Sequence, residues 1–172
     1  MPSPPAGWFH SSVQDLLDLY RHNAWANRKV FDVALGQSPE QLRADAAGTR
    51  GSVSDTLTHL ARVEYAYLVM MERRQPEQRE TYLAHDLAWF RDHVQELGQG
   101  YLQLLASATA DDLQRDMRIP WFDFPVTVRD GLLQVLSHSA QHRSQVLSWL
   151  SSQGVETPDL DYVLMLQETS KQ

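Results

Sequence analysis

The chain of 172 residues contains no cysteine. This absence excludes a disulfide framework, a zinc site built on thiolates, and a nucleophilic thiol supplied by the protein itself. A metal ion could therefore be held only by histidine and carboxylate side chains. Any thiol chemistry would need a thiol that is carried in by a substrate.

Long apolar runs and concentrated positive charge are also missing. No window approaches the roughly 18 apolar residues that a membrane-spanning helix requires, and residues 1–10 lack the pattern of a signal peptide. The 15 Lys and Arg residues are scattered along the chain, and the net charge is −7. Because phosphate binding needs a concentrated basic surface, neither nucleic acid nor membrane is an expected partner. We expect a cytoplasmic protein.

The apolar residues that are present recur at helical spacing in four long segments. They predict helices over about 12–35, 56–71, 84–106 and 128–152, with short helical turns between them and in the tail. A hydrophobic content of 42% is enough for one well-buried core. We therefore predict a single all-α domain over 1–172, which begins with an irregular arm at 1–10. The fold class is an up-and-down style four-helix bundle whose helix order stays open.

Two histidines, His138 and His142, lie four residues apart on the fourth predicted helix. At 3.6 residues per turn, both project along the edge of its apolar face. This spacing lets two imidazoles reach one metal ion, but two histidines at a wet helix edge explain a bare pair equally well. A third histidine, His59, lies at the edge of the second helix's apolar face. Alone it would be read as a hydrogen-bonded core residue; with the pair it predicts a three-histidine metal site.

Several polar residues project into the apolar faces, where unpaired groups are costly. An ion pair between Glu64 and Arg143 on neighbouring helices would satisfy both charges. The amides of Asn23 and Asn27 are interpreted as satisfied core groups rather than as pocket residues. The aromatic segment 118–126 could line a pocket mouth or plug the end of the bundle, and we favour plugging.

The same residues carry a family resemblance. The motifs are Leu57-Thr-His59-Leu on the second helix, Leu136-Ser-His138-Ser-Ala-Gln-His142-Arg143-Ser-Gln145 on the fourth, and, more weakly, Tyr20 with Trp25-Ala-Asn27 on the first. With them the chain resembles the DinB-like family, which includes the YfiT-like proteins and, more distantly, bacterial thiol-dependent S-transferases. The resemblance implies a four-helix bundle, often in a homodimer, with a three-histidine metal site. Where the family often has His-Arg-Gly-Gln, this chain has Ser144 in place of the glycine.

Carried over to this sequence, the resemblance makes His59, His138 and His142 the metal ligands. The supporting or pocket residues are Asn27, Glu64, Arg143 and Gln145. The expected cofactor is a divalent transition metal, zinc or nickel before iron or manganese. The expected function is a metal-dependent enzyme, either a hydrolase or a thiol-dependent S-transferase, acting on a small molecule in a response to stress or damage. The alternatives are a non-catalytic metal-binding accessory protein, in which His93 or Asp86 closes the coordination shell, and a helical interaction protein without metal.

Overall fold

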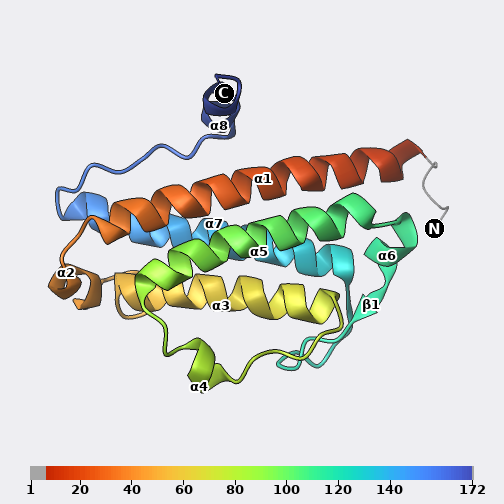
Figure 1. Cartoon of the computed structure of the whole chain (residues 1–172), viewed down its shortest axis with the longest axis horizontal. Coiled ribbons are helices and arrows are strands. Elements are labelled where there is room, and N and C mark those ends of the chain that lie inside the picture. Colours follow the sequence, from red (N-terminus) through yellow and green to blue (C-terminus); the bar gives the residue numbers. More distant parts are fainter. Residues whose placement is uncertain (1–6, 172) are drawn as a thin grey trace.

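Four long helices form the body of the molecule in the computed structural model, which describes residues 7–171 and their side chains from residue 13 onward (Figure 1). They are α1 (Gly7–Leu35), α3 (Val53–Met71), α5 (Leu87–Ser107) and α7 (Val128–Ser152). Each overlaps one of the four predicted segments. The predicted all-α four-helix bundle is confirmed.

Short elements connect the long helices. The helices among them are α2 (Pro39–Arg43), α4 (Arg79–Tyr82), α6 (Ala110–Gln114) and α8 (Tyr162–Thr169). A minimal antiparallel ladder joins β1 (Asp116–Met117) to β2 (Val126–Thr127), with Asp116 opposite Thr127. No helix in the described part of the chain is long and apolar enough to cross a membrane.

The first helix begins earlier than the sequence predicts. Helix α1 starts at Gly7, inside the segment 1–10 for which an irregular arm is predicted, so the arm is too long by four residues. The prolines that motivate the arm all lie at or before residue 5, and nothing from Gly7 onward interrupts helical hydrogen bonding. Residues 1–6 lie outside the described residues.

The helices are arranged in the order α1, α5, α3, α7 around the bundle. Helix α1 packs against α5 and α7, and α3 packs against the same two helices, so α1 and α3 face each other across a diagonal. Figure 1 shows that α3 and α5 run in the same direction, because the segment 72–86, which carries α4, returns the chain to the opposite end. Because α3 and α5 are parallel neighbours, the helices do not alternate in direction as the predicted up-and-down arrangement would require. This long crossover is also the connection that leaves the helix order open in the sequence.

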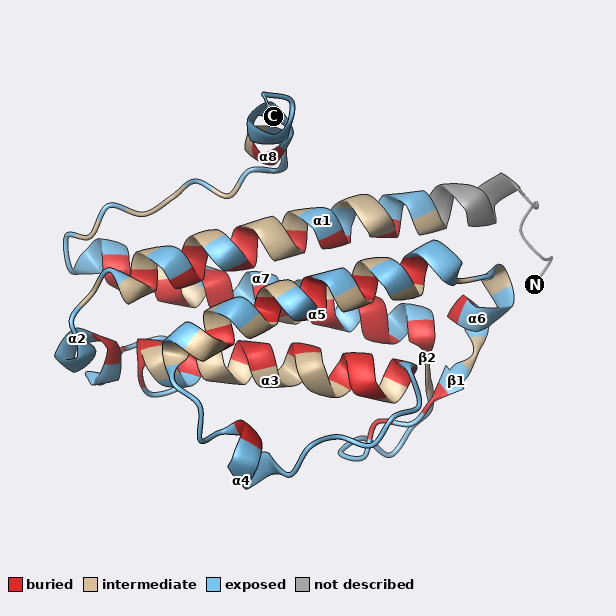
Figure 2. Cartoon of the chain, viewed as in Figure 1, coloured by how far each residue is buried: buried red, intermediate tan, exposed pale blue. Residues whose placement is uncertain are grey.

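Figure 2 shows that buried residues alternate with exposed ones along each long helix. The buried side chains form two apolar clusters separated by a polar layer. On α1, Tyr20 belongs to one cluster and Phe31 to the other, and the buried Asn23 and Asn27 lie between them. The same order recurs on α3 around Glu64 and on α7 around Ser139 and Arg143. The middle of the bundle is therefore polar and fully covered by side chains.

Helix α7 begins at the predicted capping box. The hydroxyl of Thr127 accepts a hydrogen bond from the backbone N–H of Asp130, and the carboxylate of Asp130 accepts one from the backbone N–H of Thr127. The helix ends just before Gly154, whose φ of 79° is in the left-handed region that favours glycine. Both ends of the helix that carries His138 and His142 are thus fixed by local sequence.

Candidate metal centre

Three imidazole rings converge between α3 and α7. The Nε2 atom of His138 lies 3.1 Å from Nε2 of His59 and 3.1 Å from Nε2 of His142. One nitrogen from each of the three rings lies within 4.8 Å of the other two. A metal ion at roughly 2.0–2.1 Å from each nitrogen in a tetrahedral shell would hold them roughly 3.3 Å apart. The three donors therefore fit a single divalent metal ion with little rearrangement.

The rings are also in the protonation state that a metal requires. The Nδ1–H of His142 donates to Oε1 of Gln145 at 2.7 Å, which leaves the Nε2 lone pair free to face the other rings. Loss of solvent, followed by the positive charge of Arg50, lowers the pKa of His59 to about 3. Loss of solvent, with His142 beside it, lowers the pKa of His138 to about 4. The rings are thus neutral at neutral pH, as imidazole ligands must be.

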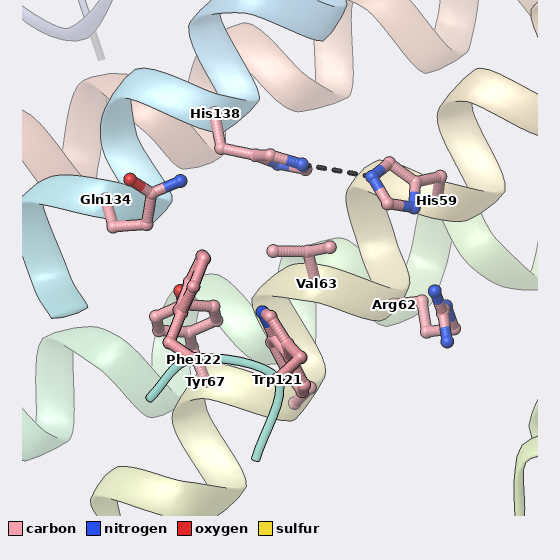
Figure 3. Close-up of a pocket in the computed structure, with 9 residues that line it drawn as sticks. His59, Arg62, Val63, Tyr67, Trp121, Phe122, Gln134 and His138 are labelled. Atoms are coloured by element: carbon pink, nitrogen blue, oxygen red, sulfur yellow. Dashed lines mark hydrogen bonds between the residues drawn. The ribbon is translucent and has the colours of Figure 1, made fainter. Parts of the chain in front are cut away.

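A cavity of about 370 Å³ opens beside His59 and His138 (Figure 3). One face of α3 forms a wall, because residues three, four, seven and eight positions after His59 project in the same direction. Helix α7 contributes Gln134, and the segment between β1 and β2 folds back to add two aromatic rings. The lining residues are His59, Arg62, Val63, Ala66, Tyr67, Trp121, Phe122, Gln134 and His138.

The aromatic segment 118–126 has two roles. Its Ile119 is buried in the apolar cluster at that end of the bundle, which matches the predicted plug. Trp121 and Phe122 instead line the cavity and are 55% and 41% exposed, so the pocket-mouth interpretation also holds. The segment thus closes the core and shapes the entrance to the histidines.

The predicted direct ion pair between Glu64 and Arg143 is wrong. Nη1 of Arg143 donates to Oδ1 of Asn23 at 2.6 Å and to Oδ1 of Asn27 at 2.7 Å. Both amide nitrogens then donate to Oε1 of Glu64, at 2.8 and 2.9 Å, and the hydroxyl of Ser139 donates to the same oxygen at 2.5 Å. Because an amide is both donor and acceptor, each asparagine separates the two charges and still satisfies them. The interpretation of the asparagines as satisfied core amides is confirmed.

This polar layer lies beneath the histidines without lining the cavity. Ser139, which donates to Glu64, follows His138 by one residue, and Arg143, which donates to Asn23, follows His142 by one residue. These hydrogen bonds therefore hold the two turns of α7 that carry the histidines. Burial lowers the pKa of Arg143 to about 10, which leaves the guanidinium charged at neutral pH. The layer therefore fixes the rotation of α7 that points its histidines toward α3.

The two candidates for a fourth ligand lie elsewhere. Nδ1 of His93 is 3.2 Å from the carboxylate of Glu96, and its ring stacks on Trp89. The carboxylate of Asp86 accepts from the backbone N–H of Trp89 at the start of α5. Among the described residues, the metal-ligand cluster contains the three histidines and no carboxylate.

Sequence reasoning missed three residues of the cavity wall. Arg62 and Tyr67 lie three and eight positions after His59, and Gln134 lies four positions before His138. That helical spacing was the available signal, since it places each of them on the face of a histidine. The spacing could not show that segment 118–126 folds back over the same face and encloses it.

Together these features define a helical bundle in which three histidines from two helices meet at the edge of a cavity. The sequence profile of the DinB family matches residues 12–172, so the chain belongs to the DinB family. The predicted resemblance is confirmed. No curated protein matches the chain.

Solved structures with the same fold include three bacterial proteins. A DinB-like protein from Bacillus cereus is 15% identical, with a TM-score of 0.67 over 85% of this chain and 95% of its own. YfiT from Bacillus subtilis, described as a probable metal-dependent hydrolase with an unusual four-helix bundle topology, is 16% identical, with a TM-score of 0.62 over 91% and 93%. The DinB-like protein YjoA from Bacillus subtilis is 17% identical, with a TM-score of 0.60 over 83% and 97%.

Proposed function

We propose that the chain is a metal-dependent enzyme that acts on a small molecule, with His59, His138 and His142 as the ligands of a divalent metal ion. The observation that carries the proposal is the convergence of three neutral imidazoles at the edge of a cavity. Three protein ligands with access from a cavity are typical of catalytic sites, whereas structural zinc sites are closed by four. Zinc and nickel are the first candidates, followed by iron and manganese.

Hydrolysis is the reaction that we favour. A bound divalent metal would supply a Lewis acid and a water molecule of lowered pKa. The chain itself would hold His142 in one tautomer through Gln145 and shield one side of the site with Trp121 and Phe122. The side-chain amide of Gln134 offers a donor at the cavity wall for a polar group of the substrate. The description of the relative YfiT as a probable metal-dependent hydrolase supports this choice.

Transfer of a low-molecular-weight thiol to an electrophile is the second candidate. The chain has no cysteine, so no protein thiolate competes with a substrate thiol for the metal. The two reactions are distinguished by parallel assays of the zinc- and nickel-loaded protein, one with a panel of esters and amides and one with several small thiols and an aryl halide. Turnover that chelation removes in only one assay identifies the reaction.

The metal site is tested by elemental analysis of protein purified without a histidine tag. We expect near-stoichiometric metal in the wild type and its loss in the His59→Ala/His138→Ala double variant. His85→Ala is the matched control, since His85 stacks on Trp89 outside the cluster. Retention of the same metal by the double variant would contradict the proposal. Bound metal without turnover in either assay would favour the non-catalytic accessory protein.

A homodimer is also part of the proposal. Its support is the family resemblance, which implies that such proteins often form homodimers. Among the described residues, Phe124 in the aromatic segment and Val163 on α8 are 57% and 64% exposed and are candidates for the interface. Size-exclusion chromatography with light scattering measures the mass. We expect twice the mass of one chain, and the mass of a single chain would contradict this part of the proposal.

A further inference from the structure

The cavity beside the histidines has one charged side chain that the metal site does not use. Arg62 lies one turn after His59 on α3 and lines the same cavity (Figure 3). It forms no ion pair and no side-chain hydrogen bond with any other described residue. No carboxylate from the described part of the chain lines the cavity, although the chain as a whole carries 22 Asp and Glu against 15 Lys and Arg. A half-buried guanidinium without a partner is therefore available to a ligand.

The surroundings of Arg62 add positive charge rather than neutralise it. Partial burial lowers the pKa of Arg62, and the nearby guanidinium groups of Arg79 and Arg50 lower it further. The same Arg50 lowers the pKa of His59. A guanidinium in a mostly apolar cavity wall, with two further guanidinium groups nearby, gives the cavity a positive potential and raises the local concentration of anions.

Apart from Gln134 and the two histidines, the remaining residues of the cavity wall are apolar or aromatic. Tyr67 and Trp121 pack edge to face with ring centroids 6.2 Å apart, and Val63 and Phe122 also line the cavity. A volume of about 370 Å³ is at the small end of ligand sites, which run from roughly 300 to 1,000 Å³. The space suits a compact molecule with one flat or aromatic part.

We infer that the cavity binds a small carboxylate with an aromatic or flat apolar body, its carboxylate on Arg62 and its body against Trp121 and Phe122. The inference rests on the proposed function for its role, because this position would present the rest of the molecule to the three histidines. A single guanidinium matches one carboxylate in charge and planar geometry. A phosphate dianion would leave one charge uncompensated, since Arg62 is the one cationic side chain among the described residues of the lining, where His59 and His138 are neutral at pH 7.

The test compares acids with their neutral amides on the full chain. Phenylacetate and hydrocinnamate are titrated against phenylacetamide and hydrocinnamamide by calorimetry, in protein stripped of metal and in protein loaded with zinc. The indole N–H resonance of Trp121, assigned with Trp121→Phe, reports whether the probe lies in the cavity. We expect each acid to bind about tenfold more tightly than its amide in both forms of the protein.

The variants locate the charge that recognises the acid. Arg62→Gln is expected to remove the preference for the acid, and Arg62→Lys to keep part of it. The control is Arg28→Gln, which removes the same charge from an exposed position on α1, outside the cavity. Equal binding of acid and amide by the wild type, a preference that survives Arg62→Gln, or tighter binding of phenyl phosphate than of phenylacetate would each overturn the inference.

Failure of the inference is distinguishable from failure of the proposed function. If the acids bind only to zinc-loaded protein and Arg62→Gln has no effect, the carboxylate binds the metal: the inference is overturned while the metal site stands. If the purified protein holds no metal and yet the stripped protein prefers acids through Arg62, the inference stands and the metal site does not.

Discussion

Gln145 decides which nitrogen of His142 faces the other two histidines. Its Oε1 accepts from Nδ1–H of His142 at 2.7 Å, whereas Nδ1 of His138 is buried and has no hydrogen-bond partner among the described residues. Partners of this kind fix the ring orientation and raise the basicity of a ligating imidazole. The two histidines of α7 therefore differ in how firmly they are held.

Replacing Gln145 should weaken metal binding without unfolding the protein. In Gln145→Ala the His142 ring loses its orienting acceptor, and we expect zinc affinity to fall by roughly 10- to 100-fold. The affinity is measured by competition with a chromophoric chelator. Gln141→Ala, at an exposed position on the same helix, is the control. Equal affinities of the two variants would show that the hydrogen bond does not support the site.

The buried layer between Glu64 and Arg143 should behave as one energetic unit. In Arg143→Met the Glu64 carboxylate remains buried without a countercharge, and we expect the free energy of unfolding to fall by about 3–5 kcal/mol. The double variant Glu64→Gln/Arg143→Met should lose less than the sum of the two single variants, because it removes both charges. Urea unfolding monitored by circular dichroism gives the three values. If the losses of unfolding free energy in the two single variants add up to the loss in the double variant, the asparagines transmit no coupling between Glu64 and Arg143.

At the scale of the helix pair, Gly98 permits the close approach of α1 and α5. A Cβ atom at Gly98 would lie 2.8 Å from Cβ of Ala24, which cannot move without its helix. A Cβ atom at Gly100 would lie 2.7 Å from Cδ2 of Leu68, a methyl group that can rotate away. The seam of α5 thus contains one glycine that is required by packing and one that is not.

Substitution by alanine should separate these two glycines. Alanine favours a helix over glycine by about 1 kcal/mol, yet overpacking costs about 1–3 kcal/mol where the neighbour is rigid. We expect Gly98→Ala to lower the free energy of unfolding and Gly100→Ala to leave it nearly unchanged or raise it. Urea unfolding of the two variants measures the difference. Equal values would contradict the close contact between α1 and α5.

The capping box of α7 gives a pH-dependent contribution to stability. The backbone N–H and the hydroxyl of Thr127 donate to the carboxylate of Asp130 and lower its pKa. The pKa of Asp130 in the folded protein is thus below the value of about 3.9 in the unfolded chain. The stabilisation by the ionised carboxylate is therefore complete above about pH 3.9 and is lost as the pH falls through the folded pKa. We expect Asp130→Asn to have a lower Tm than the wild type at pH 7, with a gap that closes below about pH 4. Asp123→Asn, in the exposed loop, should show no such gap.

The element scale also shows what the sequence could predict. The Thr127 and Asp130 pattern and Gly154 marked α7 closely because capping is local. Helix α4, in contrast, begins in a run of polar and charged residues at 73–81, where no apolar periodicity predicts a helix, and it ends at the buried Tyr82. The order of the long helices was not predictable, because an amphipathic face fits either of two neighbours equally well. The direct Glu64 to Arg143 pair failed for a related reason: α1 lies across the diagonal from α3 and inserts its amides between the charges.

At the scale of the whole molecule, the three histidines connect two helices that are distant in sequence. His59 and His138 are separated by 79 positions, and α3 and α7 are joined through α5 and the aromatic segment. The histidine spacing on α7 predicted the pair, and the position of His59 at the edge of the apolar face of another helix predicted the third candidate ligand. The fold brings His59 beside the pair because α3 packs against α7. A metal bound there would link the two helices and oppose unfolding of the whole bundle.

Removal and return of the metal should therefore shift global stability. At zinc concentrations about a thousandfold above Kd, binding to the native state alone adds about 4 kcal/mol. For a chain of this size that corresponds to an increase in Tm of roughly 10 °C. Differential scanning calorimetry of chelator-treated protein, before and after addition of zinc, measures the shift. His138→Ala should show almost none, and His85→Ala should respond like the wild type. A wild-type Tm that is the same with and without zinc would mean that the three rings do not bind the ion in the folded protein.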